Sequence, residues 1–194
     1  MTGKRWGALV GTLGMTMVVA CSDATGVNGA SSFTANITGA TTARLTGSAT
    51  ASAAGDWSRE SVVQVTLPNV GPISGIVLSA TGGSSSISFL RSGADLTTGT
   101  FNLGRPVSSP LPAGGYSAGY TIRQSDGFKL FAADSGSVTL SESGNRVDGT
   151  FTVYVSSYQV FPLPTPDQVG KVITPLSSGR SPMTITGTFS AQRN

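Results

Sequence analysis

The chain of 194 residues contains no histidine, and this absence limits the chemistry that the protein can perform. Catalytic triads and dyads that use histidine as the base are excluded, as are zinc and iron sites that require imidazole ligands. A single cysteine, Cys21, excludes an intramolecular disulfide. The Ser-x-x-Lys pattern of some serine hydrolases is also missing. Together these absences remove most hydrolase mechanisms.

Acidic residues are also few, with nine in the whole chain. Two carboxylates about 5 to 10 Å apart would be enough for a glycosidase, so a glycan hydrolase stays open as a minor alternative. Asp126 and Asp134 flank one expected strand and could approach a cation together, but no run of oxygen ligands accompanies them, and calcium takes six to eight. Turn capping is the preferred interpretation. We therefore expect no enzymatic activity, no metal and no cofactor.

The N-terminal segment has the pattern of a secretory signal. Lys4 and Arg5 precede an uncharged, mostly apolar run, Trp6 to Ala20, which is shorter than the roughly 20 residues that a bilayer span needs. Without residues 1–20, ten basic and nine acidic side chains remain, so the mature protein is about neutral. No clustered basic face is present, and a nucleic-acid partner is not expected.

The end of this segment, Val18-Val19-Ala20-Cys21, resembles the lipobox of bacterial lipoproteins. The resemblance implies cleavage before Cys21, acylation of that cysteine and anchoring in a membrane lipid layer. An ordinary secreted protein with a chance cysteine is the alternative. In such lipoproteins, an aspartate directly after the cysteine resembles a signal for retention in the inner membrane. This chain has Ser22 at that position, which favours the outer membrane. We expect residues 21–31 to form a flexible tether, spanning at most ~35 Å.

From residue 32 to the C-terminus, short segments rich in Thr and Val are separated by Gly, Pro, Asn or Ser, a pattern typical of antiparallel strands. No window shows a helical period with caps, apart from a short helical turn expected near Pro166 to Lys171. The predicted strands are Ser32 to Thr38, Ala43 to Ala51, Ser61 to Leu67, Ile73 to Ala80, Ser85 to Arg91, Gly99 to Leu103, Tyr116 to Arg123, Phe128 to Ala132, Ser137 to Ser141, Arg146 to Val155 and Met183 to Ala191.

The clearest folding signal is a β-hairpin over Ser135 to Val155. Apolar residues alternate on both sides of a polar, Gly-containing turn, and an even-numbered loop inside Ser143 to Arg146 would place Val138 and Leu140 opposite the apolar face of the second strand. On that strand, the face consists of Val147, Gly149, Phe151, Val153 and Val155.

An apolar-x-Gly-x-apolar pattern recurs at irregular spacing, twice as the longer form Gly-Thr-Phe, at Gly149 and at Gly187. A weaker copy begins at Gly99. Glycine on an inward strand face weakens the strand, but it lets a neighbouring aromatic ring lie over bare backbone. Room for a ligand is the alternative interpretation.

Two segments are rich in proline, Gly104 to Gly115 and Ser156 to Ser181, and both are predicted as loops or edges because proline cannot donate to a central ladder. The second is long, and its residues Tyr158, Phe161 and Leu163 are candidate binding residues, either in a lid over a sheet edge or in an exposed loop. Trp57 could stack on a sugar or stabilise the start of a strand.

These patterns predict a single all-β domain over residues 32–194, an antiparallel β-sandwich of about nine to eleven strands, with a small up-and-down β-barrel as the alternative. With the lipobox, the hairpin and the final Gly-Thr-Phe strand resemble small, β-rich envelope lipoproteins of Gram-negative bacteria. The expected function is a non-enzymatic binding or structural module for a protein or glycan partner. A carrier of a small ligand inside a barrel is the alternative.

Overall fold

A computed structural model describes residues 31–52, 73–92, 96–104, 115–163 and 174–193 of the chain. These residues form ten strands and no helix, and none of them belongs to a helix that could cross a membrane. The strands are β1 (Ser32–Gly39), β2 (Ala43–Ser52), β3 (Ile73–Ala80), β4 (Ser85–Ser92), β5 (Gly99–Gly104), β6 (Tyr116–Arg123), β7 (Gly127–Ala132), β8 (Ser135–Ser143), β9 (Arg146–Pro162) and β10 (Ser177–Arg193).

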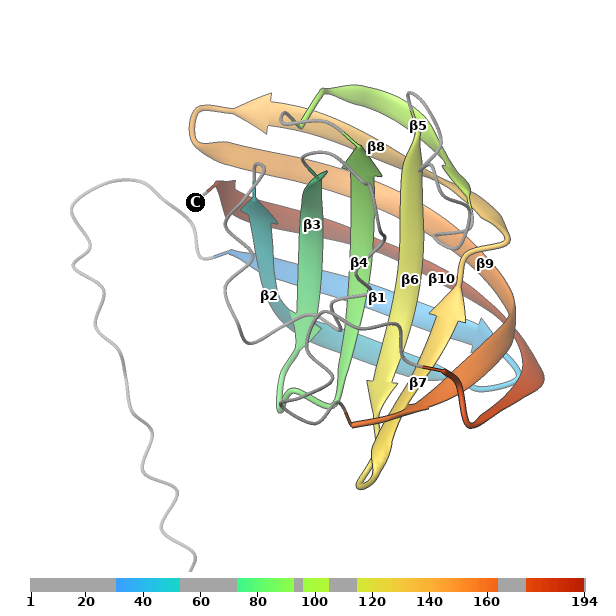
Figure 1. The fold of residues 1–194 in the computed structure, drawn as a ribbon. Helices are drawn as coiled ribbons and strands as arrows, with labels where there is room; N and C mark the ends of the chain where they lie inside the picture. Colours follow the sequence, from blue (N-terminus) through green and yellow to red (C-terminus); the bar gives the residue numbers. More distant parts are fainter. Residues whose placement is uncertain (1–30, 53–72, 93–95, 105–114, 164–173, 194) are drawn as a thin grey trace, which may run out of the picture.

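All ten strands belong to one sheet, which closes in a ring. β2, β3, β4 and β6 run side by side in one layer, and β1, β10, β9 and β8 cross behind them at a steep angle (Figure 1). β2 belongs to both layers, because its first half pairs with β1 and its second half with β3, and the change occurs at Gly47. A Cβ atom at Gly47 would lie 1.9 Å from the Ser79 carbonyl oxygen, so only glycine fits at this corner. The all-β prediction is confirmed, and the ring is consistent with both a sandwich and a barrel.

The predicted hairpin is present and is longer than its sequence pattern indicates. β8 and β9 are joined by a two-residue turn, Gly144-Asn145, in which Gly144 has a φ of +59°. Leu140 lies opposite Gly149, which confirms the even-numbered loop. β7, which precedes β8 in the chain, pairs with the same edge of β9 in the same register as β8, and its first residue, Gly127, lies opposite Pro162. The outer edge of this composite strand pairs first with β6 and then with β5.

The two Gly-Thr-Phe segments lie directly opposite each other in the core. Gly149 pairs with Phe189, and Phe151 pairs with Gly187, so each phenylalanine ring covers the bare backbone of the glycine across from it. A Cβ atom would come within 2.4 Å of the Phe189 ring at Gly149 and within 2.6 Å of the Phe151 ring at Gly187. Phe89 from the opposite layer packs on both rings, at 5.1 and 6.2 Å between centroids. The glycines make room for aromatic side chains of the core, as the sequence pattern predicts.

The outer face of the layer behind is covered by a row of threonines. Neighbouring strands place one threonine each in the same row, from β5 through β8, β9, β10 and β1 to β2, and the row consists of Thr100, Thr139, Thr150, Thr188, Thr34 and Thr46. The hydroxyls of Thr100 and Thr139 are 3.0 Å apart. Cross-strand pairs of β-branched polar residues suit a solvated sheet face. The row therefore shows that the polar, outward-facing positions of six neighbouring strands line up.

The prediction of a loop or an edge over Ser156 to Ser181 is wrong for its first part, which pairs with strands on both sides, whereas Ser177–Arg180 pairs with β9 alone among the described strands and is an edge. β9 continues to Pro162, and β10 begins at Ser177. Aromatic and apolar residues after Val155 pair with β7, and Pro162 is tolerated because it is the last residue of its strand. The segment Ser177–Pro182 has no apolar alternation of its own and extends because β9 provides a pairing edge.

β10 bends at a bulge between Arg180 and Met183, where the register with β9 shifts. Proline at a bulge removes no ladder hydrogen bond, so Pro182 fits here. The bulge divides the β9–β10 hairpin into a proximal half, next to the chain ends, and a distal half formed by Ser156–Pro162 and Ser177–Pro182. The predicted strand Ser61 to Leu67, the helical turn near Pro166 and residues 1–30 lie outside the described residues.

Candidate functional site

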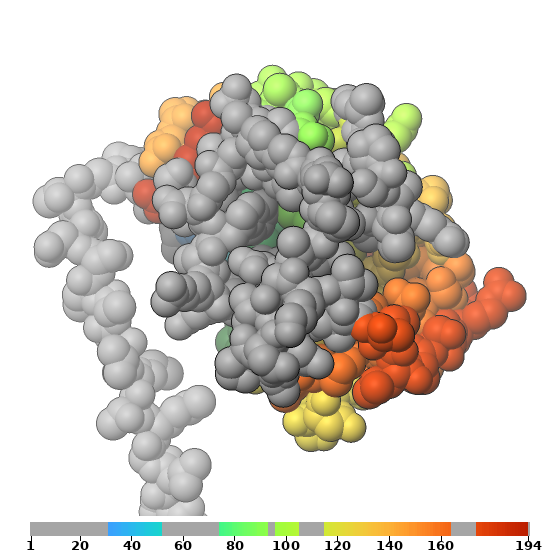
Figure 2. Space-filling view, viewed as in Figure 1, coloured from blue at the N-terminus to red at the C-terminus, as the bar shows by residue number. Residues whose placement is uncertain are grey.

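The predicted binding residues lie in or next to the distal half of the hairpin, except for Trp57, which lies outside the described residues. Tyr158 and Phe161 are in β9, and Leu163 follows its last residue. Figure 2 shows the ends of β9 and β10 in orange and red at the edge of the molecule, beside the yellow turn between β6 and β7. The sequence pattern assigned Tyr158 and Phe161 to a loop, whereas both lie in a strand.

Both aromatic rings of this group are engaged by β7. The ring of Tyr158 lies 5.3 Å from that of Phe131. The Lys129 ammonium lies 4.8 Å from the centre of the Tyr158 ring, in a cation–π contact. The ring of Phe161 is stacked on Phe128 at 5.2 Å and 12°. These contacts hold the distal half against β7, which is a structural role. Leu163 and Leu176 are the exposed apolar side chains here, at 42% and 68%.

A depression of about 480 Å³ opens at the junction between the two halves of the hairpin, where β1 ends, β10 bulges and β7 meets β8. Gly39 ends β1 with a φ of +119°, and a Cβ atom there would lie 2.5 Å from the Pro182 carbonyl oxygen. Ala40 then donates its backbone N–H to the same oxygen at 2.9 Å. The lining residues are Thr38, Gly39, Ala40, Asp134, Tyr154, Val155, Ser156, Pro182, Met183 and Thr184. We call this depression the Tyr154 groove.

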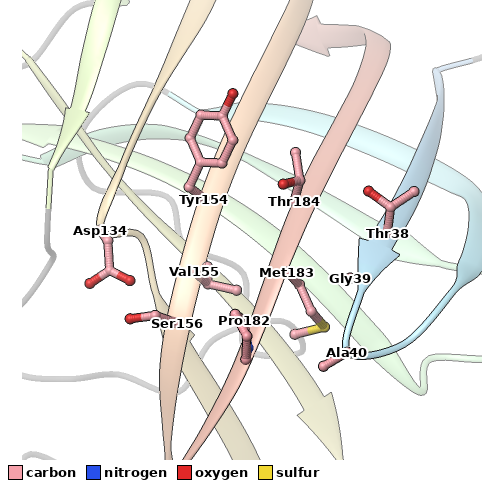
Figure 3. Close-up of a pocket in the computed structure, with 10 residues that line it drawn as sticks. All are labelled: Thr38, Gly39, Ala40, Asp134, Tyr154, Val155, Ser156, Pro182, Met183 and Thr184. Carbon is pink, nitrogen blue, oxygen red and sulfur yellow. The ribbon is translucent and has the colours of Figure 1, made fainter.

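The side chains of the Tyr154 groove combine one aromatic ring with several oxygens. Tyr154, Thr184 and Thr38 lie in one cross-strand row on β9, β10 and β1, and Figure 3 shows Asp134 beyond the strand of Tyr154. Tyr154 is 48% exposed, whereas its neighbours in the outer rows are small hydroxyl residues. Asp134 is the one charged residue among the ten that line the groove. The groove therefore offers an apolar platform, hydroxyls and a carboxylate, and has no cation.

The carboxylates do not form the cation site considered from the sequence. Asp126 lies in the turn before β7, and Asp134 lies at the other end of that strand, so eight residues of extended chain separate them by about 26 Å. In the described part of the chain, no three of His, Cys, Asp and Glu come together as a metal site would require. Turn positions account for both aspartates.

A polar network occupies the proximal end of the hairpin. Arg146 donates to Ser190 at 3.0 Å through its Nε, and Ser190 donates to Asp148. Arg193 forms an ion pair with Glu142, and the two side chains are about one third exposed. These groups connect the β8–β9 turn to the last strand, close to the start of β1, where the Gln192 N–H donates to the Ser31 hydroxyl. The network orders the chain end.

A second charged cluster surrounds Arg91 at the end of β4. Its guanidinium carbon lies 5.8 Å from the Phe101 ring centre and 5.5 Å from that of Tyr116, and Arg91 also donates to Thr97. Burial raises the pKa of the Tyr116 hydroxyl, and the neighbouring Arg91 guanidinium opposes the rise. This arrangement has the character of a packing contact of an arginine among aromatic rings, and the Arg91 Nε has no hydrogen-bond partner among the described residues.

Sequence reasoning missed the Tyr154 groove, although part of its signal was present. Tyr154 faces the polar side of its strand together with Thr150 and Thr152, so it is an exposed aromatic ring on a solvated face. The bulge at Pro182 and the end of β1 bring the remaining lining residues beside it, and neither depends on the local pattern of β9. Comparison of the chain with models of protein families, with curated proteins and with solved structures finds no match.

Proposed function

We propose that the protein is a lipoprotein of the bacterial envelope, anchored by an acylated Cys21, whose β-domain is a non-enzymatic binding module. The observation that carries the proposal is the lipobox-like Val18-Val19-Ala20-Cys21 after the uncharged run Trp6 to Ala20. Two or three acyl chains on one cysteine would hold the protein firmly in a lipid layer, since each buried CH₂ contributes about 0.8 kcal/mol. Ser22 favours the outer membrane.

The position of β1 supports a binding role away from the membrane. The strand begins at Ser32, eleven residues after Cys21, so the anchor enters the domain at the proximal end. The Tyr154 groove lies at the other end of the same strand, at Thr38–Ala40. Eight extended residues span about 26 Å, so the groove lies about that far from the end of β1 at which the tether joins the domain.

The alternative of a carrier with an internal ligand has less support. Between the two layers, the rings of Phe89, Phe151 and Phe189 are in mutual contact at 5.1 to 6.3 Å and pack that part of the described interior. The exposed features of the described residues therefore offer the better binding site. A glycan hydrolase would require two carboxylates across a cleft, and the Tyr154 groove has Asp134 alone among its ten lining residues.

The anchor is tested by replacing the acceptor sulfur. In bacteria fed a labelled fatty acid, the Cys21→Ser chain is expected to lose the acyl label and to leave the membrane fraction. The matched control Ser22→Ala keeps the lipobox and should remain labelled and membrane-bound. Continued labelling of the Cys21→Ser chain would refute the proposed anchor, whatever the β-domain binds.

A further inference from the structure

We infer that the Tyr154 groove binds a neutral, pyranose-based glycan chain. This inference deepens the proposed function by naming the class of partner, and it rests on the side chains of the groove and not on the lipid anchor. The groove has a volume of about 480 Å³ and is largely open to solvent.

The aromatic platform is the first argument. One face of a pyranose carries apolar C–H groups with partial positive charge, which suits the negative face of an aromatic ring. Tyr154 is 48% exposed, and its nearest neighbours across the sheet, Thr184 and Ser135, carry small hydroxyl side chains. Pro182 and Ala40 line the groove beyond it and add further small apolar surface.

The polar side chains are the second argument. Thr38, Ser156 and Thr184 each present a hydroxyl that can donate and accept, and the Asp134 carboxylate accepts up to about four hydrogen bonds, so it can bind a ligand hydroxyl in addition to its present partner. A sugar supplies the matching hydroxyls around its ring. The absence of a cationic side chain among the ten described lining residues argues against an anionic ligand such as a phosphate or a nucleic acid.

The rows next to the groove indicate a chain and not a single sugar. Beyond Tyr154, Thr184 and Thr38, the outer face continues with Thr152, Thr186 and Asn36, and then with the threonine row. Rows on one face repeat every second residue, about 6.7 Å apart. Hydroxyl and amide groups therefore continue from the groove across the sheet, where further sugar units of a polymer would lie.

The test measures binding of chitotetraose, maltotetraose and cellotetraose to the full chain, purified with its anchor in a detergent without sugar groups. At least one tetrasaccharide should bind saturably, and it should bind more tightly than its own monosaccharide. Loss of the ring in Tyr154→Ala should weaken binding about tenfold, whereas Tyr154→Phe keeps the platform and should stay within about twofold. Ser143→Ala, exposed at the β8–β9 turn and beyond the threonine row, should leave binding unchanged.

Three results would overturn the inference. The first is no saturable binding of any of the three tetrasaccharides, and the second is glycan binding that Tyr154→Ala does not change. The third is binding of tetralysine that Tyr154→Ala weakens, together with no binding of the glycans. The groove would then be a site for cationic ligands, held by the Asp134 carboxylate. A melting curve of each variant shows that the fold is retained. Fatty-acid labelling at Cys21 is read separately, so a failed glycan site and a failed anchor are distinguishable.

Discussion

The two halves of the β9–β10 hairpin are built from the same two strands and differ in what surrounds them. In the proximal half, β8 pairs with β9, and β1 pairs with β10, so both strands have neighbours on both edges. In the distal half, β7 pairs with β9, but no described strand pairs with the other edge of Ser177–Arg180. The proximal half is therefore held on both edges, and the Tyr154 groove lies at its boundary with the distal half, where the second neighbour of β10 ends.

The largest expected difference between the halves concerns a phenylalanine on each part of β9. Phe151 is buried under Phe89 and over Gly187, so Phe151→Ala should lower the free energy of unfolding by about 4 kcal/mol. Phe161 is half-buried and stacks on Phe128 alone, and Phe161→Ala should cost about 1.5 kcal/mol. Urea unfolding of both variants measures the difference. Equal losses would break the comparison.

A matched pair of glycines on β10 should show a smaller difference of the same sign. At Gly187, a Cβ atom would lie 2.4 Å from the Thr34 carbonyl oxygen, which is backbone of a paired strand and cannot move aside. Gly187→Ala should therefore cost about 2 to 3 kcal/mol.

At Gly179 in the distal half, a Cβ atom would meet only the outer end of the Tyr158 ring, at 2.5 Å from its hydroxyl. That side chain is half-buried at the edge of the core and can turn, so Gly179→Ala should cost about 1 kcal/mol or less. Thermal unfolding followed by circular dichroism ranks the two variants. A larger loss for Gly179→Ala would show that the distal half is as tightly constrained as the proximal one.

The smallest effect is expected at the ion pair of the proximal end. Arg193 and Glu142 are about one third exposed, so Glu142→Gln should cost no more than about 0.5 kcal/mol. The proximal half would then owe its stability to its core and not to its surface charges. If Glu142→Gln lowered the urea midpoint as much as Gly187→Ala, that assignment would be wrong.

The strands could be read from the sequence wherever one face is buried. Alternation located the start of β6 at Tyr116, because that strand carries the buried apolar residues Tyr116, Ala118 and Tyr120 at every second position. The Gly-Thr-Phe segments likewise indicated rings over bare backbone. Their direct pairing could not be read, because register between strands far apart in sequence depends on the whole sheet.

The candidate site was predictable only in part. The sequence directed attention to Tyr158 and Phe161, which bind β7 instead of presenting free rings. Tyr154 carried a local signal as an aromatic residue on a polar face. The bulge in β10 and the turn after β1 bring Pro182 and the end of β1 beside Tyr154, and Asp134 also lies there. Short-range sequence patterns cannot predict such contacts between different strands.

Amide hydrogen exchange of the full chain, followed residue by residue, tests the division of the hairpin most directly. Amides that close the ladders around Phe151 and Thr188 should exchange only through global unfolding. Those of Ser177–Arg180 should exchange through local opening, at least about a hundredfold faster, because only one neighbouring strand holds them. Equal protection in both halves would contradict the account, since the distal half would then be part of the scaffold.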